Sequence, residues 1–131
     1  MRLLGIDYGT KRVGVALSDP DGRVAFPHKT YHNDHALVTQ MVDLCTKKGV
    51  EKIIVGRSTN LNGMPNRVQK DIDSFVEQLG SKSAVPIDFE PEQFSTQAAL
   101  RIQGRGTQTD ASAAALILDS YIMRHSAMHD Q

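Results

Sequence analysis

The segment that decides the fold is Leu3-Leu4-Gly5-Ile6-Asp7-Tyr8-Gly9-Thr10-Lys11-Arg12-Val13-Gly14-Val15-Ala16-Leu17-Ser18-Asp19. Residues 3–6 form a short apolar run, which is typical of a strand covered on both faces. Asp7 ends this run, and Gly9 is expected to supply the positive φ of a tight turn. Further along, apolar side chains alternate with small ones, which predicts a second strand. The segment therefore predicts a hairpin with a carboxylate at its mouth and two cations, Lys11 and Arg12, in its turn.

Length and composition indicate an ordinary soluble globular protein. The 131 residues are 40% hydrophobic and 23% charged, so we expect one domain spanning residues 1–131. Asp7 comes too early for a signal peptide, and nothing approaches a membrane-spanning run. One cysteine, Cys45, permits no internal disulfide, so a cytoplasmic location without membrane contact is expected. The formal net charge is zero, and any basic surface for nucleic acid must therefore be local.

Hydrophobic periodicity and turn residues predict the remaining elements. Strands are expected at 2–7, 13–19, 23–31, 52–56 and 85–89. The first helix is expected to have Asn33 or Asp34 as its N-cap and to end at Gly49. A polar loop over 57–66 precedes a helix that ends at Gly80. Two more helices are predicted, from Ser95 or Thr96 to Ile102 and from Thr107 or Thr109 to Arg124.

This order of elements predicts an α/β fold. A hairpin and a third strand followed by alternating helices and strands indicate a mixed five-stranded sheet, its first three strands antiparallel, with helices on both faces. That is the ribonuclease H-like order. It is also half of an actin-like ATPase, but the chain is too short to hold the two halves that clasp a nucleotide.

Asp110 is the strongest candidate to join Asp7 in a site. It stands at the start of the last helix, in Asp110-Ala111-Ser112-Ala113-Ala114-Ala115-Leu116-Ile117-Leu118. The alanines should let this helix lie close against the sheet and bring Asp110 near the strand ends. Without other context, an acid in a first helical turn would only complement the helix dipole.

Two motifs resemble the bacterial YqgF/RuvX family. G-I-D-Y-G-T-K-R-V-G-V-A-L-S-D, residues 5–19, is similar to its opening motif, and D-A-S-A-A-A-L-I-L, residues 110–118, to its closing D-A-x-A-A motif. Members are described as Holliday junction resolvases and as nucleases that trim precursor 16S ribosomal RNA, and they have a ribonuclease H-like fold. The resemblance implies that Asp7 and Asp110 are catalytic metal ligands.

The resemblance also points to a third acid, Glu92. The family's D-E-R-[LF]-[ST]-T block, whose Glu is catalytic, corresponds to Pro91-Glu92-Gln93-Phe94-Ser95-Thr96. In this sequence Pro91 replaces the family's Asp. Gln93 replaces the family's Arg, a residue that could contact phosphate or orient the Glu. Asp88 and Glu90 are close enough in sequence to take the role instead. The remaining alternative is that Glu92 is a solvated loop acid.

Four cations are candidates for substrate contacts. Lys11 and Arg12 match the family's first turn and are expected to contact backbone phosphates near Asp7; the alternative is a solvated hairpin tip. Arg57 and Arg67 flank a loop that resembles the family's V-G-L-P-x-N-x-[DN]-G, with Arg57-Ser58 where Leu-Pro is usual. In one interpretation the loop lines a substrate groove and the two arginines face phosphates. In the other, the loop is an ordinary polar connection.

Phosphodiester hydrolysis needs charge neutralisation on the phosphoryl group and an activated water, which two divalent ions about 4 Å apart supply. Hard oxygen ligands favour Mg²⁺ or Mn²⁺. We therefore expect a metal-dependent nuclease with Asp7, Glu92 and Asp110 as ligands. Structured RNA is the favoured substrate, with processing of the 5′ end of precursor 16S ribosomal RNA in ribosome biogenesis as the favoured task.

Two other functions stay open. One is resolution of four-way DNA junctions. The other is a ribonuclease H-like module that binds nucleic acid or a protein but cleaves weakly or not at all, which the changes at Pro91 and Gln93 motivate. A monomer and a homodimer are both compatible with the sequence.

Overall fold

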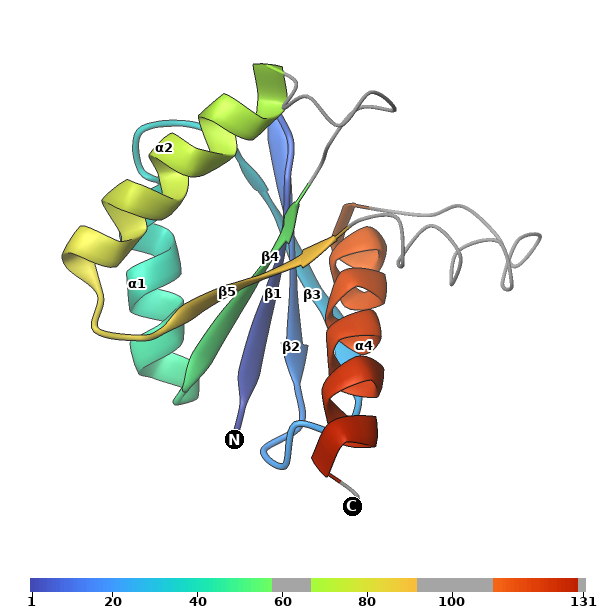
Figure 1. The fold of residues 1–131 in the computed structure, drawn as a ribbon. Coiled ribbons are helices and arrows are strands. Elements are labelled where there is room, and N and C mark those ends of the chain that lie inside the picture. Colours follow the sequence, from blue (N-terminus) through green and yellow to red (C-terminus); the bar gives the residue numbers. More distant parts are fainter. Residues whose placement is uncertain (58–66, 92–109, 130–131) are drawn as a thin grey trace.

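The computed structural model describes residues 1–57, 67–91 and 110–129, without the side chains of 67, 68 and 126–129 (Figure 1). Its elements are β1 (Leu3–Tyr8), β2 (Arg12–Ser18), β3 (Ala25–His32), α1 (Leu37–Lys48), β4 (Lys52–Arg57), α2 (Arg67–Lys82), β5 (Ile87–Pro91) and α4 (Asp110–His129). The short helix expected from Ser95 or Thr96 to Ile102 lies outside the described residues. None of the helices described has the length and apolarity needed to cross a membrane.

The strands form one mixed sheet in the order β3-β2-β1-β4-β5. β2 pairs antiparallel with both β1 and β3, whereas β4 pairs parallel with β1 and with β5. The predicted five-stranded sheet with three leading antiparallel strands is therefore confirmed. In the register, Asp7 stands opposite Gly14, and Gly56 stands opposite Glu90.

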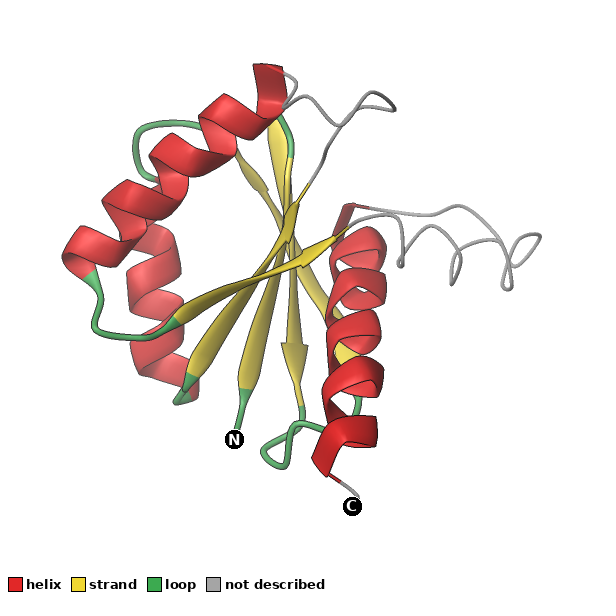
Figure 2. Ribbon diagram, in the orientation of Figure 1, coloured by secondary structure: helices red, strands yellow, loops and turns green. Residues whose placement is uncertain are grey.

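Helices cover both faces of the sheet, as predicted. α1 and α2 lie on one side of the strands, and α4 lies on the other (Figures 1 and 2). Successive residues of a strand point to opposite faces, so Leu4 and Ile6 are buried against α1 and α2, while Leu3 is buried with α4. Two hydrophobic cores result, one on each face.

Small residues let α4 lie close to the sheet. Ala111, Ala114 and Ala115 are buried, and a Cβ added to Gly5 would lie 2.9 Å from Leu118 Cβ and 3.0 Å from the carbonyl oxygen of Ala114. α4 runs antiparallel to β1, so its first turn lies near the carboxyl end of that strand (Figure 1). The expectation drawn from the alanines is confirmed.

The predicted start of α1 is wrong. The helix begins at Leu37, and its N-cap residue Ala36 makes no side-chain cap. The side chain of Asp34 instead accepts a hydrogen bond from the Ala36 backbone at 3.0 Å, and Asn33 donates to the carbonyl oxygen of Gly9 at 2.7 Å. Both polar residues therefore stabilise the turn before the helix. The predicted end is confirmed, since Gly49 caps α1 with a φ of 67°.

Two other elements shift by two residues, and the last helix is longer than predicted. α2 continues past Gly80 to Lys82 because glycine at that position needs no positive φ and the helix can accommodate it. β5 is Ile87–Pro91 rather than 85–89, since its pairing with β4 begins at Ile87. α4 extends beyond Arg124 to His129.

The positive φ predicted for Gly9 is wrong, although the residue does lie in the turn between β1 and β2. Among the described glycines, those with positive φ are Gly22 and Gly49. What Gly9 provides is the absence of a side chain, because a Cβ there would lie 2.5 Å from the carbonyl oxygen of Arg12. The turn between β1 and β2 is therefore closed by a tight backbone approach.

Candidate active site

Asp7 points to the face of the sheet that α4 covers. Along β1, Leu4 and Ile6 face α1 and α2, and the alternate positions Leu3 and Gly5 face α4. Asp7 continues this alternate series. Its carboxylate therefore lies at the carboxyl end of β1, above the first turns of α4.

The backbone of Asp110 lies against Gly14, the residue opposite Asp7. A Cβ added to Gly14 would overlap the carbonyl group of Asp110 and would lie 2.9 Å from the Ala111 nitrogen. Paired residues on antiparallel strands have Cα atoms about 4.5–5.5 Å apart, so Asp7 and Asp110 are near neighbours across this glycine. The structure brings these two predicted site residues together.

Arg12 forms an ion pair with Asp110. Its Nε lies 3.1 Å from the Asp110 Oδ2, and the two side chains are 67% and 36% exposed. The sequence predicted a phosphate contact for Arg12, but the structure places its guanidinium on a candidate ligand. The guanidinium orients the Asp110 carboxylate at the exposed mouth of the site.

The predicted third acid, Glu92, lies outside the described residues. The two acids that could replace it, Asp88 and Glu90, both contact the carboxyl-terminal half of α4. Tyr121 donates to Asp88 at 3.0 Å, and its position 11 residues beyond Asp110 corresponds to about 16 Å along a helix. Both acids are thus engaged away from Asp110.

Glu90 is held by a polar clamp that is buried at the glutamate and half-exposed at Arg124. Its side chain is fully buried, Ser120 Oγ donates to one carboxylate oxygen at 2.7 Å, and Arg124 Nη1 lies 2.7 Å from the other. This clamp joins the end of β5 to α4. The clamp therefore fixes the position of the chain two residues before Glu92. The sequence pattern did not predict this clamp.

Arg124→Met is expected to lower the free energy of unfolding by about 2 kcal/mol, because it removes the countercharge of the buried Glu90 carboxylate; the loss stays below that of a fully buried pair since the Arg124 side chain is 45% exposed. Urea unfolding followed by circular dichroism measures this change. Lys52→Met is the matched control, since its 3.6 Å pair with Asp88 joins side chains that are 30% and 44% exposed. The control should lose no more than about 1 kcal/mol. Equal losses in the two variants would contradict the idea that burial of the Glu90 carboxylate makes its ion pair more important than that of Asp88.

The other predicted substrate contacts do not gather at the carboxylates. Lys11 is exposed in the turn between β1 and β2. The Arg57 guanidinium lies over the Phe89 ring, 5.4 Å from its centroid, and Phe89 packs on the α1 and α2 face, opposite Asp110. Arg67 begins α2, and its side chain lies outside the described part. Roles for these cations stay predictions.

Across the described ranges, no group of three or more His, Cys, Asp or Glu side chains is arranged to hold a metal ion. Asp7 and Asp110 supply two hard oxygen donors, the type that Mg²⁺ and Mn²⁺ prefer. The donor set fits such an ion provided that a further ligand comes from the part of the chain that contains Glu92.

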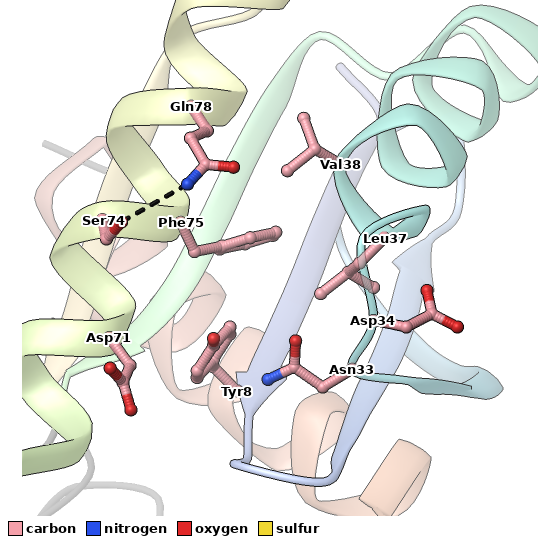
Figure 3. Close-up of a pocket in the computed structure, with 9 residues that line it drawn as sticks. All are labelled: Tyr8, Asn33, Asp34, Leu37, Val38, Asp71, Ser74, Phe75 and Gln78. Atoms are coloured by element: carbon pink, nitrogen blue, oxygen red, sulfur yellow. Dashed lines mark hydrogen bonds between the residues drawn. The ribbon is translucent and has the colours of Figure 1, made fainter.

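A separate pocket of about 230 Å³ opens between α1 and α2 on the opposite face (Figure 3). Tyr8 and Phe75 form its aromatic floor, with ring centroids 5.2 Å apart. Asn33, Asp34 and Asp71 add polar groups around it. Among the described residues that line this pocket, two are carboxylates and none is a cation.

Cys45 is a core residue, as predicted. Its side chain is buried within the core beneath α1. Burial raises the pKa of the Cys45 thiol to about 11, so the thiol stays protonated at neutral pH and is not a nucleophile.

A family model described as RuvX, Holliday junction resolvase, matches residues 1–124. The chain belongs to the RuvX family. The match spans both Asp7 and Asp110, and with it the sheet and most of α4. The resemblance noted from the two motifs is therefore confirmed over nearly the full length of the chain.

Curated relatives agree with this family. A protein of Chlorobaculum tepidum is 35% identical over 95% of this chain and 95% of its own, and one of Moorella thermoacetica is 34% identical over 95% and 96%. A third, of Maridesulfovibrio salexigens, is 30% identical over 95% of this chain and 99% of its own. Each bears the name "Putative pre-16S rRNA nuclease".

Solved structures support the fold. Thermus thermophilus RuvC in complex with a Holliday junction substrate matches with a TM-score of 0.69 at 14% identity, covering 98% of this chain and 96% of that chain. A fowlpox virus resolvase bound to Holliday junction DNA matches with a TM-score of 0.52 at 9% identity, covering all of both chains. The predicted ribonuclease H-like class is thus confirmed.

Proposed function

We propose that this protein is a metal-dependent nuclease that hydrolyses phosphodiester bonds in structured RNA and processes the 5′ end of precursor 16S ribosomal RNA. The observation that carries the proposal is the meeting of Asp7 and Asp110 across Gly14. These acids are 103 positions apart in sequence (110 minus 7), yet they share one end of the sheet in a chain of the RuvX family.

Each residue has a proposed role. Asp7, Asp110 and Glu92 would hold one or two Mg²⁺ or Mn²⁺ ions. When bound, such ions neutralise charge on the phosphoryl group and activate water. Arg12 keeps the Asp110 carboxylate oriented and, with Lys11, presents positive charge to the substrate backbone at the mouth of the site.

The relatives' name favours RNA as the substrate. A four-way DNA junction is the second candidate, because the family model is described as a Holliday junction resolvase. The third candidate, a binding module that cleaves weakly or not at all, rests on Pro91 and Gln93 in the block that contains Glu92.

Cleavage of labelled precursor 16S ribosomal RNA and of a four-way DNA junction, with Mg²⁺, with Mn²⁺ and with chelator, tests the proposal. Wild-type protein is expected to cut the RNA only when metal is present. Asp7→Asn should lower the rate by at least about 100-fold, as the loss of a transition-state stabiliser does. That variant also controls for contaminating nuclease.

Each other outcome selects a different function. Preferential cutting of the junction would replace RNA by DNA as the substrate. Intact substrates with folded protein and either metal would favour the binding module. Equal cutting by wild type and Asp7→Asn would show that the cutting does not depend on Asp7, which rejects either Asp7 as a ligand or this protein as the source of the nuclease.

A further inference from the structure

A basic groove of about 420 Å³ lies between the edge strand β3 and helix α1, apart from the carboxylates. The residues that give it its character are His28, Lys29, Tyr31, Asp43, Lys47 and Lys48. Three lysines therefore face one aspartate in a chain whose formal net charge is zero. The pocket between α1 and α2 differs, since its described lining residues include two aspartates and no cation.

A β-bulge turns two successive residues of β3 toward this groove. Lys29 pairs with Val15, and Pro27 pairs with Ala16, so His28 has no partner on β2. Such an extra residue re-aims a side chain that regular alternation would send to the opposite face. His28 and Lys29 consequently both line the groove.

Positive charge concentrates around His28. Desolvation, together with the charges of Lys48 and Lys29, holds the pKa of His28 below its ordinary value. Lys29 also lies over the Tyr31 ring, with its Nζ 5.1 Å from the centroid. Cations beside an exposed edge and an aromatic ring form a surface that suits a phosphate backbone with unpaired bases.

The groove lies on the face of the sheet opposite the candidate active site, and the edge strand β3 separates the two. Arg12, which contacts Asp110, stands opposite His32. Lys29 follows three residues away on the same strand, which corresponds to about 10 Å. A strand of nucleic acid that leaves the carboxylates must therefore pass Arg12 and cross over the edge strand β3 before it reaches the groove.

We propose that the groove between β3 and α1 binds the sugar-phosphate backbone of the single-stranded part of the substrate, beyond the phosphate that is cut. Lys29, Lys47 and Lys48 supply the contacts, and Asp43 limits how many phosphates the groove accepts. The inference rests on the proposed nuclease function for the identity of its ligand, but it concerns binding and not hydrolysis.

The test compares two variants with the same change in charge. In the groove variant Lys29, Lys47 and Lys48 are all replaced by Gln, and in the control Arg23→Gln, Lys70→Gln and Lys82→Gln alter three exposed cations elsewhere. Fluorescence anisotropy measures the binding of a short labelled single-stranded RNA in chelator, where no cutting occurs, over a range of salt concentrations. Circular dichroism verifies that both variants are folded.

The groove variant is expected to bind RNA roughly 10- to 100-fold more weakly at 0.1 M salt. The slope of log affinity against log salt should fall by about 2, since each lost phosphate contact on a single strand contributes about 0.7. The control should keep the wild-type affinity and slope. In the cleavage assay the groove variant should raise KM and leave kcat unchanged.

An unchanged slope in the groove variant, or an equal change in the control, would overturn the inference, as would a groove that binds poly-glutamate but not RNA. The two proposals fail separately. Groove-dependent binding without metal-dependent cutting would support the groove and reject the nuclease. Cutting with an unaltered slope would do the reverse.

Discussion

Asp110→Asn is expected to lower cleavage by at least about 100-fold while the protein stays folded. Asn keeps the shape of the side chain and removes the negative charge that a divalent ion needs. The cost in stability is small, because the ion pair with Arg12 joins side chains that are 36% and 67% exposed and such pairs contribute at most about 1 kcal/mol. Cleavage rates, Mn²⁺ titration and a thermal melt together measure the three quantities.

Arg12→Gln is the matched variant, because it breaks the same ion pair but keeps the Asp110 carboxylate. It should retain Mn²⁺ binding, which Asp110→Asn should lose. If both variants lost metal binding equally, the ion pair and not the carboxylate would be the essential feature. Cleavage by Asp110→Asn at more than a tenth of the wild-type rate would reject Asp110 as a ligand.

Gly14→Ala is expected to disable the site without altering any ionisable group. The added Cβ would overlap the Asp110 carbonyl, and the atoms it meets belong to the backbone of α4 and cannot rotate away. The first turn of α4 must therefore move away from β2, which separates Asp110 from Asp7. A displacement of about 1 Å costs around 100-fold in rate, and such overpacking lowers the free energy of unfolding by about 1–3 kcal/mol.

Gly80→Ala is the control for Gly14→Ala. The atom nearest to its added Cβ would be Ile87 Cδ1 at 4.0 Å, and alanine in a helix is more favourable than glycine by about 1 kcal/mol. It should keep full activity and a slightly higher melting temperature. Cleavage assays and urea unfolding of both variants distinguish a specific contact from a general intolerance of alanine. Full activity in Gly14→Ala would refute the packing argument.

Sequence patterns predicted the architecture because each element carries its own periodicity. The apolar run before Asp7 and the alanines after Asp110 report local properties, namely a doubly covered strand and a helix that can approach it closely. Those two properties were enough to place one carboxylate near the other. The boundaries of α1 and β5 were less predictable, because a hydrogen bond from Asn33 to Gly9 and pairing with β4 decide them.

The contacts that complete the site depend on tertiary register. The clamp of Arg124 on Glu90 joins β5 to α4, and the Arg12 guanidinium reaches Asp110 from β2. The two members of each pair are more than 30 residues apart in sequence, and the chain contains many other charged residues that could form such a pair. The bulge at His28 is likewise a property of how β3 pairs with β2. One sequence signal was available, since a glycine inside a strand often marks a close approach, as Gly14 does.

The distance in sequence between Asp7 and Asp110 has a consequence for biosynthesis. A ribosome adds about 5–20 residues per second, so the second carboxylate follows the first by roughly 5–20 s. Until α4 has emerged and packed on the sheet, the nascent chain lacks half of the acid pair. If the two acids act as proposed, the metal site is therefore incomplete for most of the protein's own translation.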